Sequence, residues 1–442
     1  MEKLPVETVS HICSFLSHRR DIQAFRLVCK SLAAIGAEYV RQSFFMHMTE
    51  HHLNQLFDLS SETQLARGIE YICYAPITLS TPGATANEYQ HIRDSNHYSD
   101  NNLEPLGGYT RYTSLRVEQA NIMRTNRDFD LFLTAFQQFP RLRHIKLFSY
   151  YSTLAQGGPL VQRARYGELT QFNYAINLTS AIASVRHLNI LLEVIALARV
   201  KLETLELDQI DWRFFDRDVT ELQKVLEPIA KLKCFNISIS NLYTHLIQPF
   251  APMAELTRCR RLMDSGVLQK CLSIFTEARC LSLVFNHWCL PMHKWDPAFG
   301  APPQSASLSQ IVPKNFTWTH LTMLRLCHID AERQELMAVL LRHKGTLQVL
   351  YLQSIYLRSS SWIPLLDSIR KELYLTEACI GGVLSGHFED EENDGELQYW
   401  RLYPGYQESL LGLVNAYVLK DGEDPAPKTC PLTYENSLKR VG

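Results

Sequence analysis

The chain has 442 residues, and its 44 Lys and Arg against 46 Asp and Glu give a formal net charge of −2 at pH 7. This balance lacks the basic excess that is typical of nucleic-acid-binding proteins. A content of 46% hydrophobic and 20% charged residues is globular and excludes wholesale disorder.

The 11 cysteines contain no C-x-x-C pair, which argues against a disulfide framework or a zinc ribbon and favours a reducing compartment, cytosol or nucleus. The first residues lack the apolar core of a secretory signal. The most apolar stretch, Leu188 to Val200, is too short and too charged to span a bilayer. We therefore expect neither nucleic acid nor a membrane among the partners.

The first 45 residues predict three short helices. The first has an apolar stripe at helical spacing, formed by Val9, Ile12, Cys13 and Leu16. A second helix is expected from Asp21, and a third helix has an apolar face formed by Val28, Leu32, Ile35, Gly36 and Tyr39. So small a unit buries little surface, which favours docking on a partner.

These residues resemble the F-box motif over about residues 3–42. The resemblance rests on Leu4-Pro5-Val6-Glu7, Ile12, Leu16, Asp21-Ile22 and the run from Arg26 to Leu32, which match the motif in order and spacing. It implies docking on the Skp adaptor and, through it, on the cullin of a ubiquitin ligase. The implied adaptor-binding residues are Leu4, Pro5, Ile12, Leu16, Val28, Cys29 and Leu32. Thr8 and Leu32 stand where the family often has Leu and Trp, which lowers the affinity that we expect.

Residues 46–75 read as helical, and residues 76–113 read as a long loop rich in Pro, Gly, Asn, Ser and Tyr. Short runs with L-x-x-L-x-L spacing then alternate with helical patterns. Six strands are expected at 142–147, 202–207, 232–237, 278–283, 321–326 and 347–352, with a seventh at Leu373 to Leu375. Helices are expected at 129–139, 188–198, 222–229, 267–275 and 336–341.

This alternation resembles a leucine-rich-repeat solenoid, in which each repeat covers the apolar face of its neighbour. The strand spacing is irregular, so an ordinary α/β domain with a parallel sheet is the alternative. After the repeats we expect an acidic loop at 388–396, an amphipathic helix from Trp400 to Leu419 that caps the solenoid, and a loose tail at 420–442.

The predicted fold class is therefore α+β or α/β, with an N-terminal three-helix F-box followed by an irregular leucine-rich-repeat-like α/β solenoid. The expected domains are the F-box at 1–45, a helical linker and long loop at 46–126, the solenoid at 127–385, and the acidic loop, capping helix and tail at 386–442.

Catalytic motifs are not evident. The sequence has no G-x-x-x-x-G-K-[ST], G-x-G-x-x-G after a strand, G-x-S-x-G or H-E-x-x-H motif. His287, Cys289 and His293 are possible zinc ligands, but no fourth ligand stands at a suitable spacing. We expect no enzymatic activity, metal or cofactor.

The combined features are similar to fungal-type F-box proteins with diverged repeats, which implies a substrate-recognition subunit of an SCF-type (Skp–cullin–F-box) ubiquitin ligase. Exposed groups after the strands are the expected contacts for an unidentified protein target: Asp208, Asn241, Tyr243, His287, Trp288, His328 and Tyr356. Trp212 is expected in the core. Two alternatives are a Skp-bound scaffold without a role in ubiquitylation, and a repeat-type binding protein whose N-terminal helices only form a cap.

Overall fold

In the computed structural model, the structure describes residues 4–16, 19–37, 39, 42–76, 78, 105–148, 181–240, 253–286, 306–387, 397–403, 407–420, 427–433 and 436–437. The fold is mixed α/β with a large, mostly parallel sheet. The chain forms two compact units, Met1–Asp208 and Gln209–Gly442. The coarse prediction of alternating helices and parallel strands is thus confirmed.

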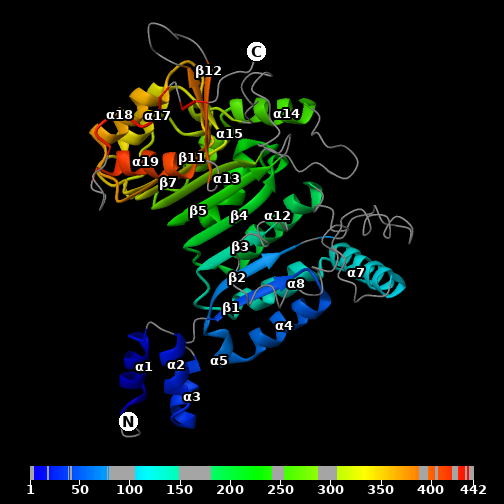
Figure 1. The fold of residues 1–442 in the computed structure, drawn as a ribbon. Helices are drawn as coiled ribbons and strands as arrows, with labels where there is room; N and C mark the ends of the chain where they lie inside the picture. Colours follow the sequence, from blue (N-terminus) through cyan, green and yellow to red (C-terminus); the bar gives the residue numbers. More distant parts are fainter. Residues whose placement is uncertain are drawn as a thin grey trace. The chain divides into compact units, whose positions relative to one another are not determined.

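The first unit begins with the three predicted short helices (Figure 1). They are α1 (Val6–Ser14), α2 (Arg19–Arg26) and α3 (Lys30–Ala37). Their shared core is small and consists of Val9, Cys13, Ile22, Leu32 and Ala37.

The remainder of the first unit is a parallel sheet with the strand order β1-β2-β3-β4. Its elements are β1 (Gln42–His47), α4 (Glu50–Ser61), α5 (Thr63–Ala66), β2 (Ile69–Ala75), α7 (Pro105–Thr125), α8 (Arg127–Gln137), β3 (His144–Phe148), α12 (Ala181–Ala198) and β4 (Thr204–Asp211). Ile145 pairs with Ile72 and with Leu205, which forms one buried apolar row. Helix α8 packs beside both α4 and α12.

The prediction for residues 46–75 was wrong in part, because this stretch folds as strand, helix and strand. Strand β2 is buried along most of its length, and a buried parallel strand has a continuous apolar sequence without alternation. Helix α7 also begins at Pro105, inside the stretch expected to be a loop.

The second unit has the parallel strand order β5-β6-β7-β9-β11, with β12 antiparallel to β11. Its strands are β5 (Cys234–Ser240), β6 (Cys280–Asn286), β7 (Met323–Cys327), β8 (Asp330–Ala331), β9 (Val349–Gln353), β10 (Tyr356–Leu357), β11 (Glu377–His387) and β12 (Leu397–Leu402). Its helices are η1 (Trp212–Phe215), α13 (Val219–Leu226), η2 (Glu227–Ile229), α14 (Met253–Asp264), α15 (Val267–Leu272), α16 (Leu308–Ile311), α17 (Arg333–Arg342), α18 (Trp362–Glu372) and α19 (Glu408–Leu419).

The predicted leucines form two buried rows across this sheet. One row joins Phe235, Leu281, Leu324 and Leu350, and the next joins Ile237, Leu283, Leu326 and Leu352. All of these side chains are buried, as are Ile145, Leu147, Leu205 and Leu207 on β3 and β4 of the first unit. The six predicted strands are therefore confirmed with their apolar face inward. The seventh strand was misplaced, because α18 continues to Glu372 and β11 begins only at Glu377.

Three neighbouring strands of the second unit share a left-handed backbone position. His328, Ser354 and Gly382 have φ values of 57°, 52° and 79°. The backbone N–H of His328 donates to the Gln353 carbonyl, and that of Ser354 donates to the Gly381 carbonyl. Beyond these corners, β8, β10 and the second half of β11 form a further set of parallel pairs.

The C-terminal part departs from the prediction at two points. Trp400 lies in strand β12, so the expected helix from Trp400 to Leu419 is a strand followed by the shorter α19. The described part of the tail is packed, since Leu432 is buried and the Trp400 indole N–H donates to Asn436. The acidic run at 388–396 lies outside the described residues.

Helix α19 packs on β11, the last parallel strand, and the Asn415 side chain accepts a hydrogen bond from the Ile380 backbone N–H at 2.7 Å. This contact satisfies a backbone donor on β11. No helix in the described part of the chain is both long and apolar enough to cross a bilayer.

Candidate functional site

The N-terminal helices expose an unusual concentration of apolar side chains. The described residues include twelve exposed large hydrophobic side chains, and six of them lie between residues 4 and 28. These six, named here the apolar patch, are Leu4, Val6, Ile12, Phe15, Leu27 and Val28. Several large apolar side chains exposed on one small unit often mark a surface that binds a partner.

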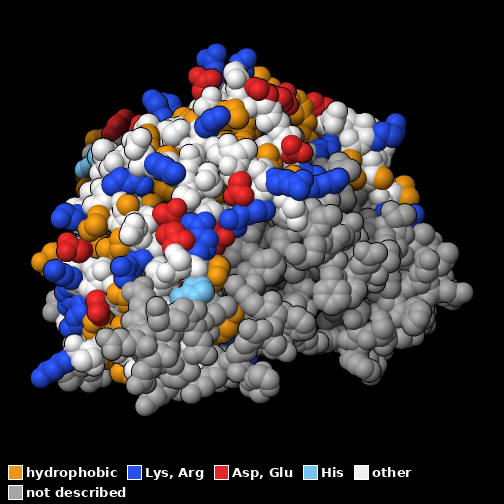
Figure 2. Space-filling view, turned by 90° about the horizontal axis from the view of Figure 1, so that it is seen from above, with side chains coloured by type: hydrophobic (Ala, Val, Ile, Leu, Met, Phe, Trp, Pro, Cys, Tyr) orange, Lys and Arg blue, Asp and Glu red, His pale blue; other side chains and the backbone are white. Residues whose placement is uncertain are grey.

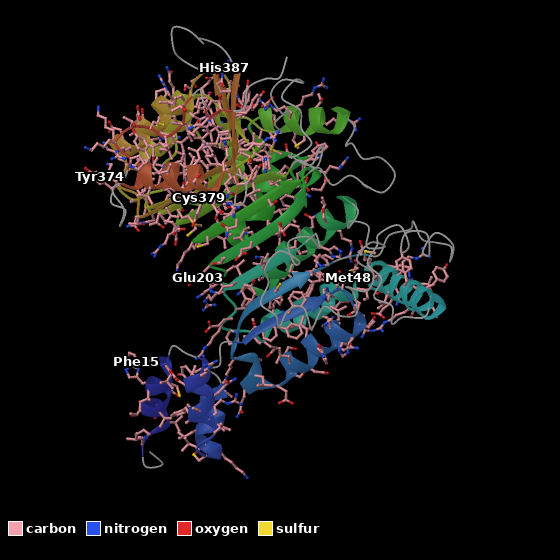
Figure 3. All side chains as sticks on the ribbon, viewed as in Figure 1. Phe15, Met48, Glu203, Tyr374, Cys379 and His387 are labelled. Carbon is pink, nitrogen blue, oxygen red and sulfur yellow. The ribbon has the colours of Figure 1, made fainter. Side chains whose placement is uncertain are left out.

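The first part of the patch arises from the way α1 packs. Val9 and Cys13 face the small core, whereas Ile12 is on the outer side of the helix. Helix α1 ends at Ser14, so Phe15 and Leu16 belong to the turn that follows. Phe15 is 72% exposed, and Figure 3 labels its side chain beside α1.

The second part of the patch is the short connection between α2 and α3. Leu27 is 87% exposed and Val28 is 65% exposed. The prediction that Val28 lies on the face of the third helix was wrong, because α3 begins only at Lys30. A three-residue connection outside both helices cannot turn all its side chains into the core, so two apolar residues face solvent.

Of the seven predicted adaptor-binding residues, four are exposed, namely Leu4, Pro5, Ile12 and Val28. Leu16 and Cys29 are half-buried, and Leu32 is a core residue with 3% exposure. The prediction did not include Val6, Phe15 or Leu27. Their signal was present in the sequence, since each is a large apolar residue at a helix end.

Gly36 sets the close packing of α2 against α3. A Cβ atom on Gly36 would lie 2.6 Å from Cγ of Arg26 and 3.3 Å from Cδ1 of Phe25. The Arg26 guanidinium also donates to the Ala33 carbonyl at 3.3 Å. Leu32 precedes Gly36 by one helical turn, so it points to the same interior.

The predicted target-binding residues are only partly described. Asn241, Tyr243, His287 and Trp288 lie outside the described residues. Asp208 is half-buried on β4, in the first unit. In the second unit, His328 directly follows β7 and Tyr356 begins β10, and both are half-buried.

The environments of the described target-binding candidates limit what they can do. Burial, and then the nearby Arg325, lowers the pKa of His328 to about 4, so its imidazole is neutral at pH 7. Burial also raises the pKa of Tyr356. These two groups can therefore offer neutral hydrogen bonds but no charge. Trp212 is buried, as predicted.

A network of ion pairs lies close to His328 and Tyr356 in the chain, around Asp330 and Arg358. The Arg358 guanidinium contacts Asp330 at 3.3 Å, Glu332 at 3.1 Å and Glu335 at 2.9 Å. Asp330 also receives a hydrogen bond from Arg260 at 2.5 Å. These pairs join β8, α14 and α17 to Arg358, the residue that follows β10, and they give this part of the unit a structural role.

A buried polar network in the first unit was not predicted. Arg186 on α12 makes a bidentate ion pair with Asp128 on α8, at 2.7 and 2.9 Å. The Tyr74 hydroxyl lies 3.2 Å from Nδ1 of His187, and that nitrogen is 3.9 Å from Asp128. Burial lowers the pKa of His187 to about 3 and raises that of Tyr74 well above its usual value.

This network resembles catalytic side chains in composition only. Tyr74, His187 and Asp128 are all fully buried. A nucleophile or base must reach a substrate to act. We therefore assign the network to holding α8, α12 and β2 together.

The described residues contain no group of three or more His, Cys, Asp or Glu side chains arranged to bind a metal ion. On the face drawn in Figure 2, basic and acidic side chains are intermingled rather than separated. No known protein family's sequence profile matches the chain, and no curated protein matches it significantly.

Proposed function

We propose that this protein is the substrate-recognition subunit of an SCF-type ubiquitin ligase, with residues 1–45 forming an F-box that binds the Skp adaptor. The observation that carries the proposal is the apolar patch, because it coincides with the segment that resembles an F-box. Leu4, Ile12 and Val28 belong both to that signature and to the exposed side chains.

Burial arguments support an adaptor on this surface. The three helices have 9, 8 and 8 residues and share a core of a few side chains. Covering each large apolar side chain contributes about 1.5–3 kcal/mol relative to leaving it exposed. A partner that covers several patch residues would therefore stabilise this small unit while gaining affinity.

We further propose that the sheet belongs to a degenerate leucine-rich-repeat solenoid that binds a protein target. The support is the repeated succession of parallel strand, left-handed corner and short second strand at β7, β9 and β11. The proposed target contacts in the second unit are His328, directly after β7, and Tyr356, at the start of β10. Asp208, also predicted as a target contact, lies within β4 rather than after it.

The proposed mechanism requires no chemistry from this chain. The adaptor would connect the chain to a cullin, and the solenoid would hold the target beside a ubiquitin-charged enzyme. Binding of this kind acts by raising the effective concentration of the target. The proposed location is the cytosol or the nucleus, where such ligases are expected and cysteines stay reduced.

The decisive experiment is a pulldown of the tagged chain with purified Skp adaptor, comparing Val28→Asp with Val117→Asp. Val28 is 65% exposed in the patch and Val117 is 64% exposed on α7, so the two substitutions are matched in chemistry and exposure. We expect Val28→Asp to weaken binding at least about tenfold, because a charge would be desolvated at the interface. Val117→Asp should bind like the native chain, and Leu4→Ala/Pro5→Ala should also lose binding.

No binding by the native chain would overturn the proposal and leave the N-terminal helices as a cap. An equal loss in Val28→Asp and Val117→Asp would show that the patch is not the docking surface. If the adaptor binds but a cullin never joins the complex, the scaffold alternative would replace the ligase subunit.

A further inference from the structure

Two cysteines face each other across neighbouring strands of the second unit. Cys234 is the first residue of β5 and Cys280 is the first residue of β6, and the parallel register pairs them directly. Since side chains alternate along a strand, both thiols lie on the sheet face opposite the buried Phe235 and Leu281. Both cysteines are half-buried and neither is part of a disulfide, so small reagents can reach them.

The geometry of the pair is suitable for a covalent bond. Neighbouring strands lie about 4.8 Å apart, and disulfides join Cα atoms that are about 4.4–6.8 Å apart. A hydrogen bond already joins the two thiols. At this end of the strands, the Lys233 carbonyl accepts hydrogen bonds from the backbone N–H groups of both Arg279 and Cys280. Moving the Cβ atoms of Cys234 and Cys280 slightly closer would therefore disturb only the first backbone hydrogen bonds between β5 and β6.

The hydrogen bond also affects the pKa of Cys280. The contact with Cys234, followed by burial, raises the pKa of the Cys280 thiol. Cys280 therefore keeps its proton at neutral pH and can donate it toward the Cys234 sulfur. A thiol that donates a hydrogen bond to a neighbouring sulfur favours the thiolate form of that neighbour, and the thiolate is the nucleophilic form of cysteine.

We propose that Cys234 and Cys280 form a site of reversible oxidation, at which a hydroperoxide converts the paired thiols into a disulfide between β5 and β6. The Cys234 thiolate attacks one peroxide oxygen, the O–O bond breaks, and a sulfenic acid forms at Cys234 while the second oxygen leaves as water or alcohol. The Cys280 sulfur then attacks the sulfenic sulfur and releases water. In total, two thiols and one hydrogen peroxide give one disulfide and two waters, and a thiol reductant reverses the change.

The same sheet provides an internal comparison. Cys327 and Cys379 also lie in the second unit, but the Gln353 side chain stands between them, 4.0 Å from one sulfur and 3.7 Å from the other. This pair contacts a shared amide instead of another thiol. We therefore expect it to stay unlinked under conditions that link Cys234 to Cys280.

The test uses the reduced full-length chain, treated with hydrogen peroxide, blocked with N-ethylmaleimide and digested with trypsin without reduction. Lys233 and Arg279 directly precede the two cysteines, so cleavage gives peptides that begin at Cys234 and at Cys280. We expect one linked peptide pair that is 2 Da lighter than the sum of its parts and that separates on reduction. Cys234→Ser and Cys280→Ser should abolish the link, and Cys327→Ser should retain it.

Cys289 lies in the same tryptic peptide as Cys280, so Cys289→Ser is the required control and should keep the link. The oxidised native chain should also unfold at a temperature several degrees higher than the reduced chain, because a cross-link restricts the unfolded state. A native chain that gives no linked peptide, that links Cys234 elsewhere, or that accumulates sulfinic acid at Cys234 would overturn the proposal. The native chain gives this result whether or not a variant folds.

Discussion

At the scale of single residues, His187 makes the first unit sensitive to acid. Its pKa is about 3 in the folded chain against an ordinary value near 6.5, because burial disfavours the imidazolium. In this pH range His187 is protonated in the unfolded chain but stays neutral in the folded chain. The folded state therefore loses stability as the pH falls from about 6.5 toward 3. The loss is about 1.4 kcal/mol per pH unit for this one group.

We predict that His187→Gln unfolds with a weaker pH dependence than the native chain. Between pH 6.5 and pH 5 the variant should lose about 2 kcal/mol less stability, measured by urea unfolding at each pH. Leu191→Ala, on the same helix and equally buried, is the control that loses stability but no titrating group. If Leu191→Ala shows the same reduced pH dependence, the effect does not come from His187.

Single residues of this kind also mark a limit of sequence reasoning. Asp128 and Arg186 are 58 positions apart, and neither is part of a recognisable motif. Only the packing of α8 beside α12 brings them together. Three of the exposed apolar residues, Leu4, Ile12 and Val28, were easier to anticipate, because their order along the chain carries the F-box resemblance without any tertiary information.

At the scale of elements, the left-handed corner in β11 depends on a glycine. Gly382 has a φ of 79°, and a Cβ atom there would lie 2.3 Å from the Ser354 hydroxyl oxygen and 2.8 Å from the Ser354 backbone nitrogen. We predict that Gly382→Ala lowers the free energy of unfolding by at least about 2 kcal/mol, through the left-handed backbone and the collision.

Gly412 provides the matched comparison. It lies exposed in α19, and a Cβ atom there would meet nothing within 4 Å. Gly412→Ala should stabilise the chain by about 0.5–1 kcal/mol, because alanine favours the helix. Thermal unfolding of both variants checks the pair, and equal effects of the two substitutions would contradict the assigned role of the corner.

The elements show where sequence patterns succeed and where they fail. The positions of strands with two leucines separated by one residue were predicted correctly. In these strands one face is buried, so apolar residues alternate along the sequence. Strand β2 was missed because both of its faces contact other groups, which removes the alternation. Trp400 was predicted in a helix because a short amphipathic run fits both the helical period of 3.6 residues and the strand period of 2. Only the pairing of β12 with β11 shows that this residue lies in a strand.

At the scale of the whole chain, we expect the N-terminal helices to contribute little to the stability of the remaining residues. Their core consists of their own side chains, and α3 reaches the rest of the first unit through α5 and a cation–π contact of Arg141 with Tyr39. We predict that deleting residues 1–41 changes the Tm of the remaining chain by less than about 3 °C, measured by calorimetry. A much larger loss would show that these helices complete the core of the first unit.

At this scale the sequence predicts a parallel sheet, but it does not decide whether the sheet is a repeat solenoid. The rows of leucines establish parallel strands in register, but a solenoid requires that the same repeat be stacked many times. In the second unit, the spacing between register-matched residues is 46, 43, 26 and 28 along Phe235, Leu281, Leu324, Leu350 and Ala378. The sequence therefore could not decide between a degenerate solenoid and another parallel α/β sheet.

The unequal spacing along a continuous apolar row also bears on how such a protein can diversify. Each strand keeps its place through two inward residues, so the connection to the next strand can gain or lose many residues without altering the sheet. Length variation is then tolerated in the connections between strands, which are the segments that usually carry binding specificity. Related proteins with this fold can therefore acquire new binding partners through changes in the loops between strands, while the parallel sheet stays the same.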